Sequence, residues 1–353
     1  MTCRCHTPIR LFALILAVCL LFAASSAWSA DDLFRTVRDS NGNEVRLPAK
    51  IDKVAPTIGA FAQMTCILSQ GEVSIAAAAT NTISRRFKQV VPWYEKGNPN
   101  NYDASSIEDI LASKAQVVYG PGARHSTEQQ RQLEEAGVPF VLVDKIRTVA
   151  DLCESYLLIG DILGGNAVER AKTFVAYYKG NMEMARTRTA AVKKRIRFIS
   201  MNYAGNAYST INRKDICHEY IDAAGGENVA AEYNIASSTS NIPVDIEQLI
   251  RWDPEVIMMG SQQGREAILA DPSLIHISAI KAKRVYVCPF GIFRWSARSG
   301  EGAMLPLWLG KNLHPELFAD IDMQTVVRDF FKQFYAYDIT DKEVDDILEG
   351  RNR

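Results

Sequence analysis

The sequence predicts an α/β protein made of two three-layer α/β lobes with mainly parallel sheets, joined by one long α-helix. Three observations support this fold class. A helix–strand unit occurs twice, 139 residues apart, and a long uninterrupted helical segment lies between the two copies. The chain has 353 residues, which at about 150 residues per domain is enough for two hydrophobic cores.

The repeated unit consists of an N-cap residue, a short amphipathic helix, a turn and an apolar strand. Residues 106–119 align without gaps with residues 245–258. Ser106 and Asp245 suit the N-cap, and a glutamate follows in the first turn of each copy, where the helix dipole favours it. Short apolar strands that alternate with helices indicate a parallel sheet covered on both faces. Two such units indicate two similar lobes.

The region between the two copies is strongly helical. Thr148 suits the N-cap of a first helix, which Gly164 and Gly165 end. A second helix follows and runs to about Val192, without Pro or Gly between residues 167 and 179. At 1.5 Å per residue, roughly 22 residues reach ~33 Å, which is enough to cross one lobe and enter the next. This helix predicts a stiff connector and less hinge motion than a loop would allow.

The other elements complete the predicted organisation. Asn41-Gly42 within an alternating stretch predicts a hairpin over 35–47. Apolar runs predict strands over 51–57, 195–202 and 284–289 and helices over 59–68, 215–224 and from 316 onward, with Phe330, Phe331, Phe334 and Tyr335 in packing roles. The predicted division is a signal peptide over 1–30, an N-terminal α/β lobe over 31–165, a linking helix over 166–192, and a C-terminal α/β lobe with C-terminal helices over 193–353.

The first thirty residues differ from the rest of the chain. Arg4 and Arg10 form a short basic start, and residues 11–24 carry no charge. This run is shorter than the ~20 residues that span a bilayer, and small residues follow it. We therefore expect a signal peptide that is cleaved near Ala30, and hence a periplasmic protein. A retained membrane anchor is the alternative, and Cys19 gives only a loose match to a lipoprotein signal.

Composition argues against several classes of function. Without Arg4 and Arg10, 38 basic residues face 41 acidic ones, and no basic run suits a phosphate backbone, so we expect no nucleic-acid partner. No GxSxG, P-loop, GxGxxG or HExxH motif occurs, so we expect neither an enzyme nor a resident cofactor. The cysteines outside the leader lack metal or redox spacing, and we expect small buried side chains, with one disulfide as the alternative: Cys66, Cys153, Cys217 and Cys288.

Four segments in this order resemble the periplasmic binding proteins of ABC importers for ferric siderophores, haem and cobalamin, whose lobes are joined by one long helix. Residues 35–57 (RTVRDSNGNEVRLPAKIDKVAPT) resemble the entry hairpin and first strand of that family. The repeated Ile-Glu helix and its apolar strand resemble the helix–strand unit of each lobe. Residues 219–229 (EYIDAAGGENV) and 301–318, which include LPLWLGKNLHPELF, are similar to two segments of the second lobe.

The resemblance implies how the protein docks and which metals it does not bind. Members often carry one exposed glutamate on each lobe that pairs with arginines of the permease. Glu219 stands at the second-lobe position, whereas the first-lobe region has Gln63, so a symmetrical carboxylate pair is absent from this sequence. Relatives that bind bare zinc or manganese use several histidines with carboxylates. The four histidines outside the leader are scattered over both lobes, and we expect no such site: His125, His218, His276 and His314.

The fold class itself selects candidate ligand-binding residues. In open α/β sheets, ligands bind outside the carboxyl ends of the strands, and in two facing lobes these ends line the cleft. The candidates in the first lobe are Thr57, Thr80, Asn81, Arg124 and His125. Those in the second lobe are Tyr203, Tyr208, Phe290, Phe293, Arg294, Trp295 and Arg298.

Residues 290–298 are the strongest candidate segment, because two phenylalanines, a tryptophan and two arginines follow a predicted strand directly. Flat apolar faces beside fixed positive charge suit a planar or chelate ligand with carboxylates, which arginine grips with two hydrogen bonds. The competing interpretation is surface arginines beside core aromatics.

We therefore expect an exported solute-binding component that captures a metal chelate in the cleft between the lobes and delivers it to an ABC permease dimer. The chelate would be a ferric siderophore, haem or a corrinoid. The alternatives are a free metal ion, a nickel–histidine complex, a small amino-acid-like ligand, or a periplasmic sensor that uses the same cleft. All of these require residues 117–119 and 256–258 to lie in two separate sheets.

Overall fold

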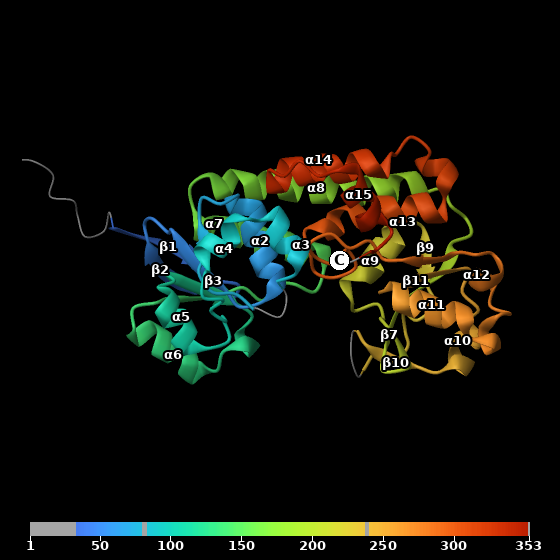
Figure 1. Ribbon diagram of the computed structural model, residues 1–353, viewed down its shortest axis with the longest axis horizontal. Coiled ribbons are helices and arrows are strands. Elements are labelled where there is room, and N and C mark those ends of the chain that lie inside the picture. Colours follow the sequence, from blue (N-terminus) through green and yellow to red (C-terminus); the bar gives the residue numbers. More distant parts are fainter. Residues whose placement is uncertain (1–32, 80–82, 237–239, 352–353) are drawn as a thin grey trace, which may run out of the picture.

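The computed structural model describes residues 33–79, 83–236 and 240–351. They form two α/β lobes with long helices that run along one side of both (Figure 1). The predicted signal peptide lies outside the described residues, as do Thr80 and Asn81. In the described part of the chain, no helix is both long enough and apolar enough to cross a bilayer.

The N-terminal lobe begins with a hairpin and continues into a parallel sheet. Its elements are β1 (Phe34–Arg38), β2 (Glu44–Pro48), β3 (Lys53–Pro56), α2 (Gly59–Ser69), β4 (Ser74–Ile75), α3 (Arg85–Val90), α4 (Trp93–Gly97), α5 (Ile107–Ser113), β5 (Val117–Gly120), η3 (Gly122–Arg124), α6 (Thr127–Glu135), β6 (Phe140–Leu142) and α7 (Val149–Leu163). β1 and β2 pair antiparallel around Asn41-Gly42, as predicted. The four sheet strands are parallel and lie in the order β4-β3-β5-β6.

The C-terminal lobe follows a connecting helix, α8 (Asn166–Thr189). Its elements are β7 (Ile196–Ala204), β8 (Ala207–Thr210), α9 (Ile216–Ala223), β9 (Gly226–Asn228), β10 (Ile242–Val244), α10 (Ile246–Trp252), β11 (Val256–Met259), α11 (Gln262–Ala270), η4 (Pro272–Leu274), α12 (Ser278–Lys281), β12 (Val285–Val287), η5 (Glu301–Met304), α13 (Leu305–Leu313), η6 (Pro315–Phe318), α14 (Met323–Tyr335) and α15 (Asp341–Leu348). The sheet order is β10-β8-β7-β11-β12, with β9 paired to β7. β7 pairs parallel with β9 and β11, and β8 pairs antiparallel with β7 and β10.

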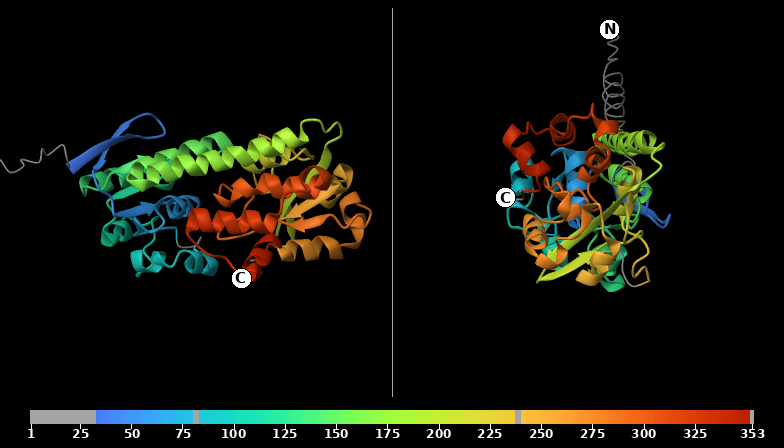
Figure 2. Two further views of the ribbon diagram at one scale, coloured as in Figure 1. Left: turned by 90° about the horizontal axis from the view of Figure 1, so that it is seen from above. Right: turned by 90° about the vertical axis from the view of Figure 1, so that its right-hand side faces the viewer.

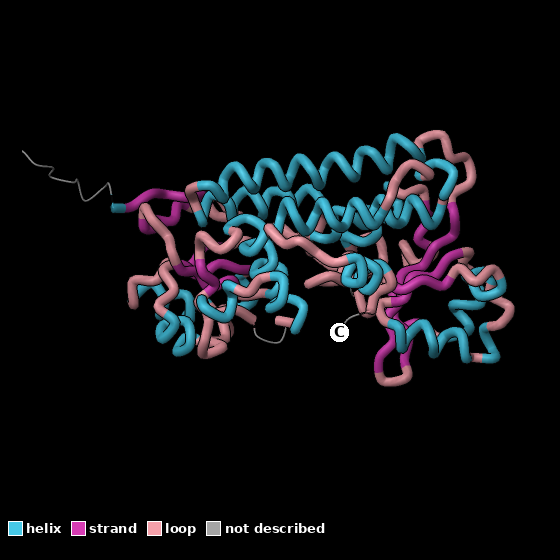
Figure 3. The backbone as a smooth tube through the Cα atoms, turned by 45° about the horizontal axis from the view of Figure 1, so that its top comes forward, coloured by secondary structure: helices cyan, strands magenta, loops and turns pink. Residues whose placement is uncertain are grey.

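The repeated helix–strand unit has the same local structure in both lobes. The side chain of Ser106 caps α5 by accepting the N–H of Asp109, and Asp245 caps α10 by accepting the N–H of Gln248. The strands that follow, β5 and β11, belong to separate sheets. Figure 3 shows these sheets as two groups of strands well apart from each other, below the helices that run across both lobes. The predicted fold class is therefore confirmed.

The connecting helix α8 packs against α7, the last helix of the N-terminal lobe. Thr148 caps α7 together with Asp151, and Gly164 ends this helix in a positive-φ conformation that favours glycine. α8 has 24 residues, or ~36 Å, and Figure 2 shows it extending over both lobes. Gly160 lets α7 approach α8 closely, because a Cβ at this position would lie 2.7 Å from the Cβ of Ala171.

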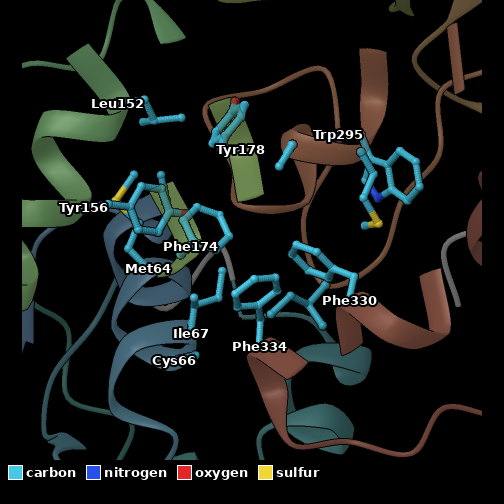
Figure 4. Packing of buried hydrophobic residues seen from close by; sticks show 14 of the residues in the cluster. Met64, Cys66, Ile67, Leu152, Tyr156, Phe174, Tyr178, Trp295, Phe330 and Phe334 are labelled. Carbon is cyan, nitrogen blue, oxygen red and sulfur yellow. The ribbon is translucent and has the colours of Figure 1, made fainter. Parts of the chain in front are cut away.

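The lobes share one hydrophobic core beside α8. The cluster of buried side chains is continuous from β3 and β5 of the first sheet to β7 and β11 of the second. Phe174 of α8 lies at the centre of this cluster (Figure 4), with its ring centroid 4.1 Å from that of Tyr156 and 5.1 Å from that of Phe334. Each lobe also has a smaller outer core of its own.

The C-terminal helices return to the N-terminal lobe. Gln70, which follows α2, donates to the backbone oxygen of Gln333 in α14 at 2.9 Å. Gln89 of α3 donates to the carboxylate of Glu343 in α15 at 2.7 Å. The buried packing expected for Phe330, Phe331, Phe334 and Tyr335 is confirmed. Because α14 and α15 contact both lobes, the boundaries at residues 165 and 192 stay a prediction.

The four described cysteines are buried and free. They occupy core positions in α2, α7, α9 and the segment after β12. Burial raises the pKa of all four thiols: Cys66, Cys153, Cys217 and Cys288. The expectation of small buried side chains is confirmed, and the alternative of a disulfide among these four is not.

Phe174→Ala will test whether the aromatic cluster holds the lobes together. We expect a loss of ~3–5 kcal/mol in the free energy of unfolding, because the change leaves a cavity in the shared core. Met184→Ala on the same helix is the control, because that side chain is 38% exposed and its loss is expected to stay within ~0.5 kcal/mol. Chemical denaturation measures both, and equal losses would contradict a central role for Phe174.

Candidate functional site

The carboxyl edge of the first sheet carries Thr57, directly after β3. Its side chain is buried, its backbone N–H donates to the oxygen of Tyr119 at 3.0 Å, and its hydroxyl has no hydrogen-bond partner among the described residues. Gly120, at the end of β5, makes room for this hydroxyl, since a Cβ there would lie 1.7 Å from it. The first lobe therefore presents a buried, unsatisfied hydroxyl at the predicted edge.

His125 lies in the outer core of the first lobe. Its ring is buried, with its centroid 5.8 Å from that of Phe140, and neither ring nitrogen hydrogen-bonds to another described residue. Burial lowers the pKa of this imidazole, which favours its neutral form. Arg124 ends η3, and its side chain lies outside the described part of the structure.

A cavity of about 170 Å³ lies at the carboxyl ends of β7, β11 and β12 in the second lobe. This is the edge that the fold class selects for ligands. The residues that line the cavity include two arginines, three serines and two asparagines: Arg294, Arg298, Ser200, Ser240, Ser296, Asn202 and Asn241. The two arginines were predicted, and the structure brings them together here.

The strand ends position the polar side chains of this cavity. Ser200 and Asn202 alternate along β7 and so point to the same face of the sheet. Arg294 donates from Nη1 to Oδ1 of Asn202 at 2.9 Å. Gly260, directly after β11, leaves space for this pair, because a Cβ there would lie 2.2 Å from Asn202 Oδ1 and 3.1 Å from Arg294 Nη1.

Two hydrogen bonds between the lobes hold the segment Phe290–Arg298, which we call the arginine loop. Arg298 donates from Nε to the backbone oxygen of Ile146, after β6 in the first lobe, at 2.9 Å. Arg86 of α3 donates from Nη1 to the backbone oxygen of Phe290 at 3.1 Å. Both ends of the arginine loop are therefore anchored on the opposite lobe.

The cavity favours negative charge. Among the described residues that line it, Asp215 is the one carboxylate, against the two guanidinium groups of Arg294 and Arg298. Asp215 accepts the N–H of Cys217 at 3.0 Å and so caps α9, whose positive N-terminus lies at the cavity wall. Burial raises the pKa of Asp215, and Arg298 opposes that rise. Arginines, hydroxyls, amides and a helix N-terminus together suit a bound anion.

The aromatic residues of the arginine loop do not all face the cleft. Trp295 is completely buried and donates from Nε1 to Oε2 of Glu301 at 3.0 Å. Its indole therefore supports the arginine loop from inside the core. For Trp295, this agrees with the competing interpretation, in which the aromatic residues of this segment belong to the core. Phe290 and Phe293 remain partly exposed beside the arginines.

Tyr203 and Tyr208 lie in a different hollow from the arginines. Their ring centroids are 5.1 Å apart, and they line a space of about 990 Å³ together with Tyr233, Asp245 and Asp271. β7 continues to Ala204 and pairs with β8, so residues beyond Asn202 extend away from the sheet edge. The structure thus separates these tyrosines from the cavity at the strand ends.

The two predicted docking residues are not equivalent in the structure. Gln63 is completely buried, and its amide donates to Glu301 and Tyr335 and accepts from the N–H of Gly300. It therefore offers no surface to a permease. Glu219 of α9 is half-buried and accepts the N–H of Val149 at the start of α7, at 3.2 Å. Burial raises the pKa of its carboxyl.

The sequence-based prediction did not include several residues that line the cavity. Ser200 and Asp215 were not predicted, although they lie beside the two arginines. Asn202 was included only as the first residue of the strand-end segment 202–208, from which Tyr203 and Tyr208 were chosen. A signal for Ser200 was present, because Ser200 and Asn202 are polar at alternate positions between the apolar residues Ile199 and Met201. Asp215 carried no such signal, since an N-cap aspartate is common at any helix.

Comparison with known families matches residues 69–291 to a family described as periplasmic binding protein. A curated relative, the molybdate-binding protein MolA of Haemophilus influenzae, is 24% identical over 91% of this chain and 95% of its own length.

Solved structures share the fold over most of the chain. A periplasmic solute-binding protein from Veillonella parvula has a TM-score of 0.73 at 22% identity and covers 89% of this chain and 97% of its own. MolA bound to molybdate has a TM-score of 0.72 at 20% identity, over 87% and 99% of the two chains. Helicobacter pylori CeuE with bound Ni(II) has a TM-score of 0.68 at 17% identity, over 89% and 99%.

Gly260→Ala will test whether the cavity wall is tightly fitted. The added Cβ must displace Asn202 and Arg294, and we expect a loss of ~1–3 kcal/mol in the free energy of unfolding. Gly180→Ala in α8 is the control, because nothing lies within 4 Å of its added Cβ, and it should raise stability by up to ~1 kcal/mol. Chemical denaturation of both variants checks this, and an unchanged midpoint for Gly260→Ala would show a pliable wall.

Proposed function

The chain belongs to the periplasmic binding protein family, and we propose that it captures a compact oxyanion such as molybdate and delivers it to the permease of an ABC importer. The observation that carries this proposal is the placement of Arg294 and Arg298 in one cavity at the carboxyl ends of the strands. Arginine recognises oxyanions through several directed hydrogen bonds without losing its charge at any physiological pH.

The size of the cavity favours a small anion. Its volume is about 170 Å³. Drug-sized ligands occupy pockets of ~300–1,000 Å³. A haem, corrinoid or intact siderophore therefore exceeds this cavity, whereas a tetrahedral oxyanion fits within it. The likeness to MolA over nearly the whole chain supports the same choice.

A metal chelate is the second candidate. Phe290 and Phe293 are partly exposed beside the arginines and offer apolar faces to a larger ligand held between the lobes. Such a ligand would insert one carboxylate arm into the cavity while its body lies against these rings. This arrangement corresponds to the ferric siderophore, haem or corrinoid expected from the sequence.

The proposal also includes two further properties: the protein binds its ligand without catalysing a reaction, and it is exported. Residues 1–30 would direct the chain to the periplasm, where it would carry its ligand between the outside and the membrane permease. Glu219 is the remaining candidate for contact with the permease, through the part of its side chain that is exposed.

Isothermal titration of the purified protein tests the choice of ligand. We expect molybdate to bind in the cavity, and Arg294→Ala combined with Arg298→Ala to weaken it at least about a hundredfold, because each charged hydrogen bond contributes ~1.5–3 kcal/mol. Arg251→Ala on α10 removes an exposed arginine of the same lobe and should leave the affinity unchanged.

Titrations with a ferric catecholate chelate and with haem run alongside distinguish the two candidates. Binding of a chelate with no response to molybdate would replace the first candidate by the second. Retention of full molybdate affinity by the double variant would remove the arginine loop from the site.

A further inference from the structure

The carboxylate of Glu301 is buried directly behind the arginine loop. This residue begins η5, and its side chain is completely inaccessible to solvent. Its Oε1 accepts the backbone N–H of Ile292 at 2.9 Å, and its Oε2 accepts the indole N–H of Trp295 at 3.0 Å. Both donors belong to the arginine loop and stand on either side of Arg294 and Phe293. This carboxylate therefore holds the middle of the arginine loop, between its two anchored ends.

The same carboxylate meets the N-terminal lobe and the C-terminal helices. Gln63 of α2 donates to Oε1 at 3.2 Å, and the hydroxyl of Tyr335 in α14 donates to it at 3.4 Å. The amide oxygen of Gln63 accepts the N–H of Gly300 at 2.9 Å. Elements from three distant parts of the sequence thus converge on Glu301, and the arginine loop is one of them.

The hydrogen-bond donors around Glu301 favour an ionised carboxylate, whereas its burial favours the protonated form. Its closest partners are N–H groups, which can only donate, and a carboxylate can only accept. Gly291 lets the arginine loop wrap closely around the group, since a Cβ there would lie 1.9 Å from Oε2. A protonated Glu301 would direct its O–H toward these donors and lose an acceptor position. A buried polar group without a partner costs ~1–3 kcal/mol.

We propose that Glu301 is the positioning residue of the arginine loop: its ionised carboxylate holds the backbone that aims Arg294 and Arg298 into the cavity, and proton uptake loosens this hold. The consequence for anion affinity rests on the function proposed above. The positioning of the arginine loop itself does not, because it follows from the hydrogen bonds alone.

Glu301 changes charge near neutral pH. Burial raises its pKa to about 7, against the opposing effects of its N–H donors and of Arg86 in α3. The other titratable groups around it are Tyr156 of α7, Tyr335 of α14 and, beside these two, Cys66 of α2. Burial raises the pKa of all three, so they stay neutral around pH 7.

The direction of the pH effect follows from this shift. Because the pKa of Glu301 in the fold lies above its ordinary value of 4.5, the fold favours the protonated form, and stability decreases as the pH rises toward 7. Above pH 7 the carboxylate is ionised and holds the arginine loop. Above pH 7 the protein is therefore less stable, but its arginine loop is held in position. Below pH 7 the stability increases and the arginine loop is held less firmly.

Intrinsic fluorescence of the ligand-free protein tests the positioning directly, through the indole bonded to Glu301. Titration from pH 5.5 to 8.5 should show a transition with a midpoint near pH 7 in the wild type. Glu301→Gln and Trp295→Phe should both lack it. Tyr335→Phe removes one donor to the carboxylate and should raise the midpoint, which a purely structural role would not do. A transition that persists in Glu301→Gln would overturn the proposal.

Molybdate titrations at pH 6 and pH 8 test the consequence for binding. The wild type should bind at least about tenfold more weakly at pH 6, and Glu301→Gln should show equal affinities at the two values. Circular dichroism confirms the fold of each variant, and Tyr335→Phe carries the test if Glu301→Gln does not fold. Equal wild-type affinities at both values would overturn the link to binding. Absence of molybdate binding would refute the proposed ligand, while the fluorescence transition still decides the role of Glu301.

Discussion

The hydrophobic core that the two lobes share along α8 is the constraint on which the rest of the structure depends. Phe174 contacts rings from α7 and α14, and the same cluster of buried side chains reaches both sheets. Rotating one lobe against the other would expose part of this surface, at ~25 cal/mol for each Å² of apolar area. The geometry between the lobes is therefore set by packing, and α8 alone does not determine it.

A fixed frame allows the binding elements to be preorganised. The arginine loop lies between the lobes and is attached to the first lobe through Arg86 and Arg298 and to the core through Glu301. Side chains that are already held in place lose less conformational freedom when a ligand binds. The structure thus concentrates its rigidity behind the arginines, while their ends line the cavity.

The sequence was sufficient to predict the architecture, because its signals were local. The caps at Ser106, Thr148 and Asp245, the hairpin turn and the duplicated helix–strand unit each depend on a few neighbouring residues, and all appear in the structure. The return of α14 and α15 to the first lobe was not predicted, because the partners are remote in the chain and amphipathic helices do not specify what covers them.

The site was predicted less completely, for a physical reason. The rule of strand ends located the arginine loop, but it does not determine which side chain of a loop turns outward. Trp295 turns inward because Glu301 accepts its indole N–H, and Gln63 is buried by partners in two other elements. Tyr203 and Tyr208 lie elsewhere because β7 continues past the sheet edge as a hairpin. Each of these outcomes depends on long-range contacts.

Every residue of α2 is buried, and α14 supplies part of its cover. The contact between Gln70 and Gln333 joins positions 263 residues apart. In a chain synthesised from its N-terminus, this fully buried helix therefore stays partly uncovered until almost the whole polypeptide has emerged. Folding must bring together segments that are far apart in the chain, which is slow. Until then the incompletely folded N-terminal lobe exposes an apolar surface that favours aggregation. A chain that stops before residue 323 would leave that helix without the cover of α14 and open to aggregation.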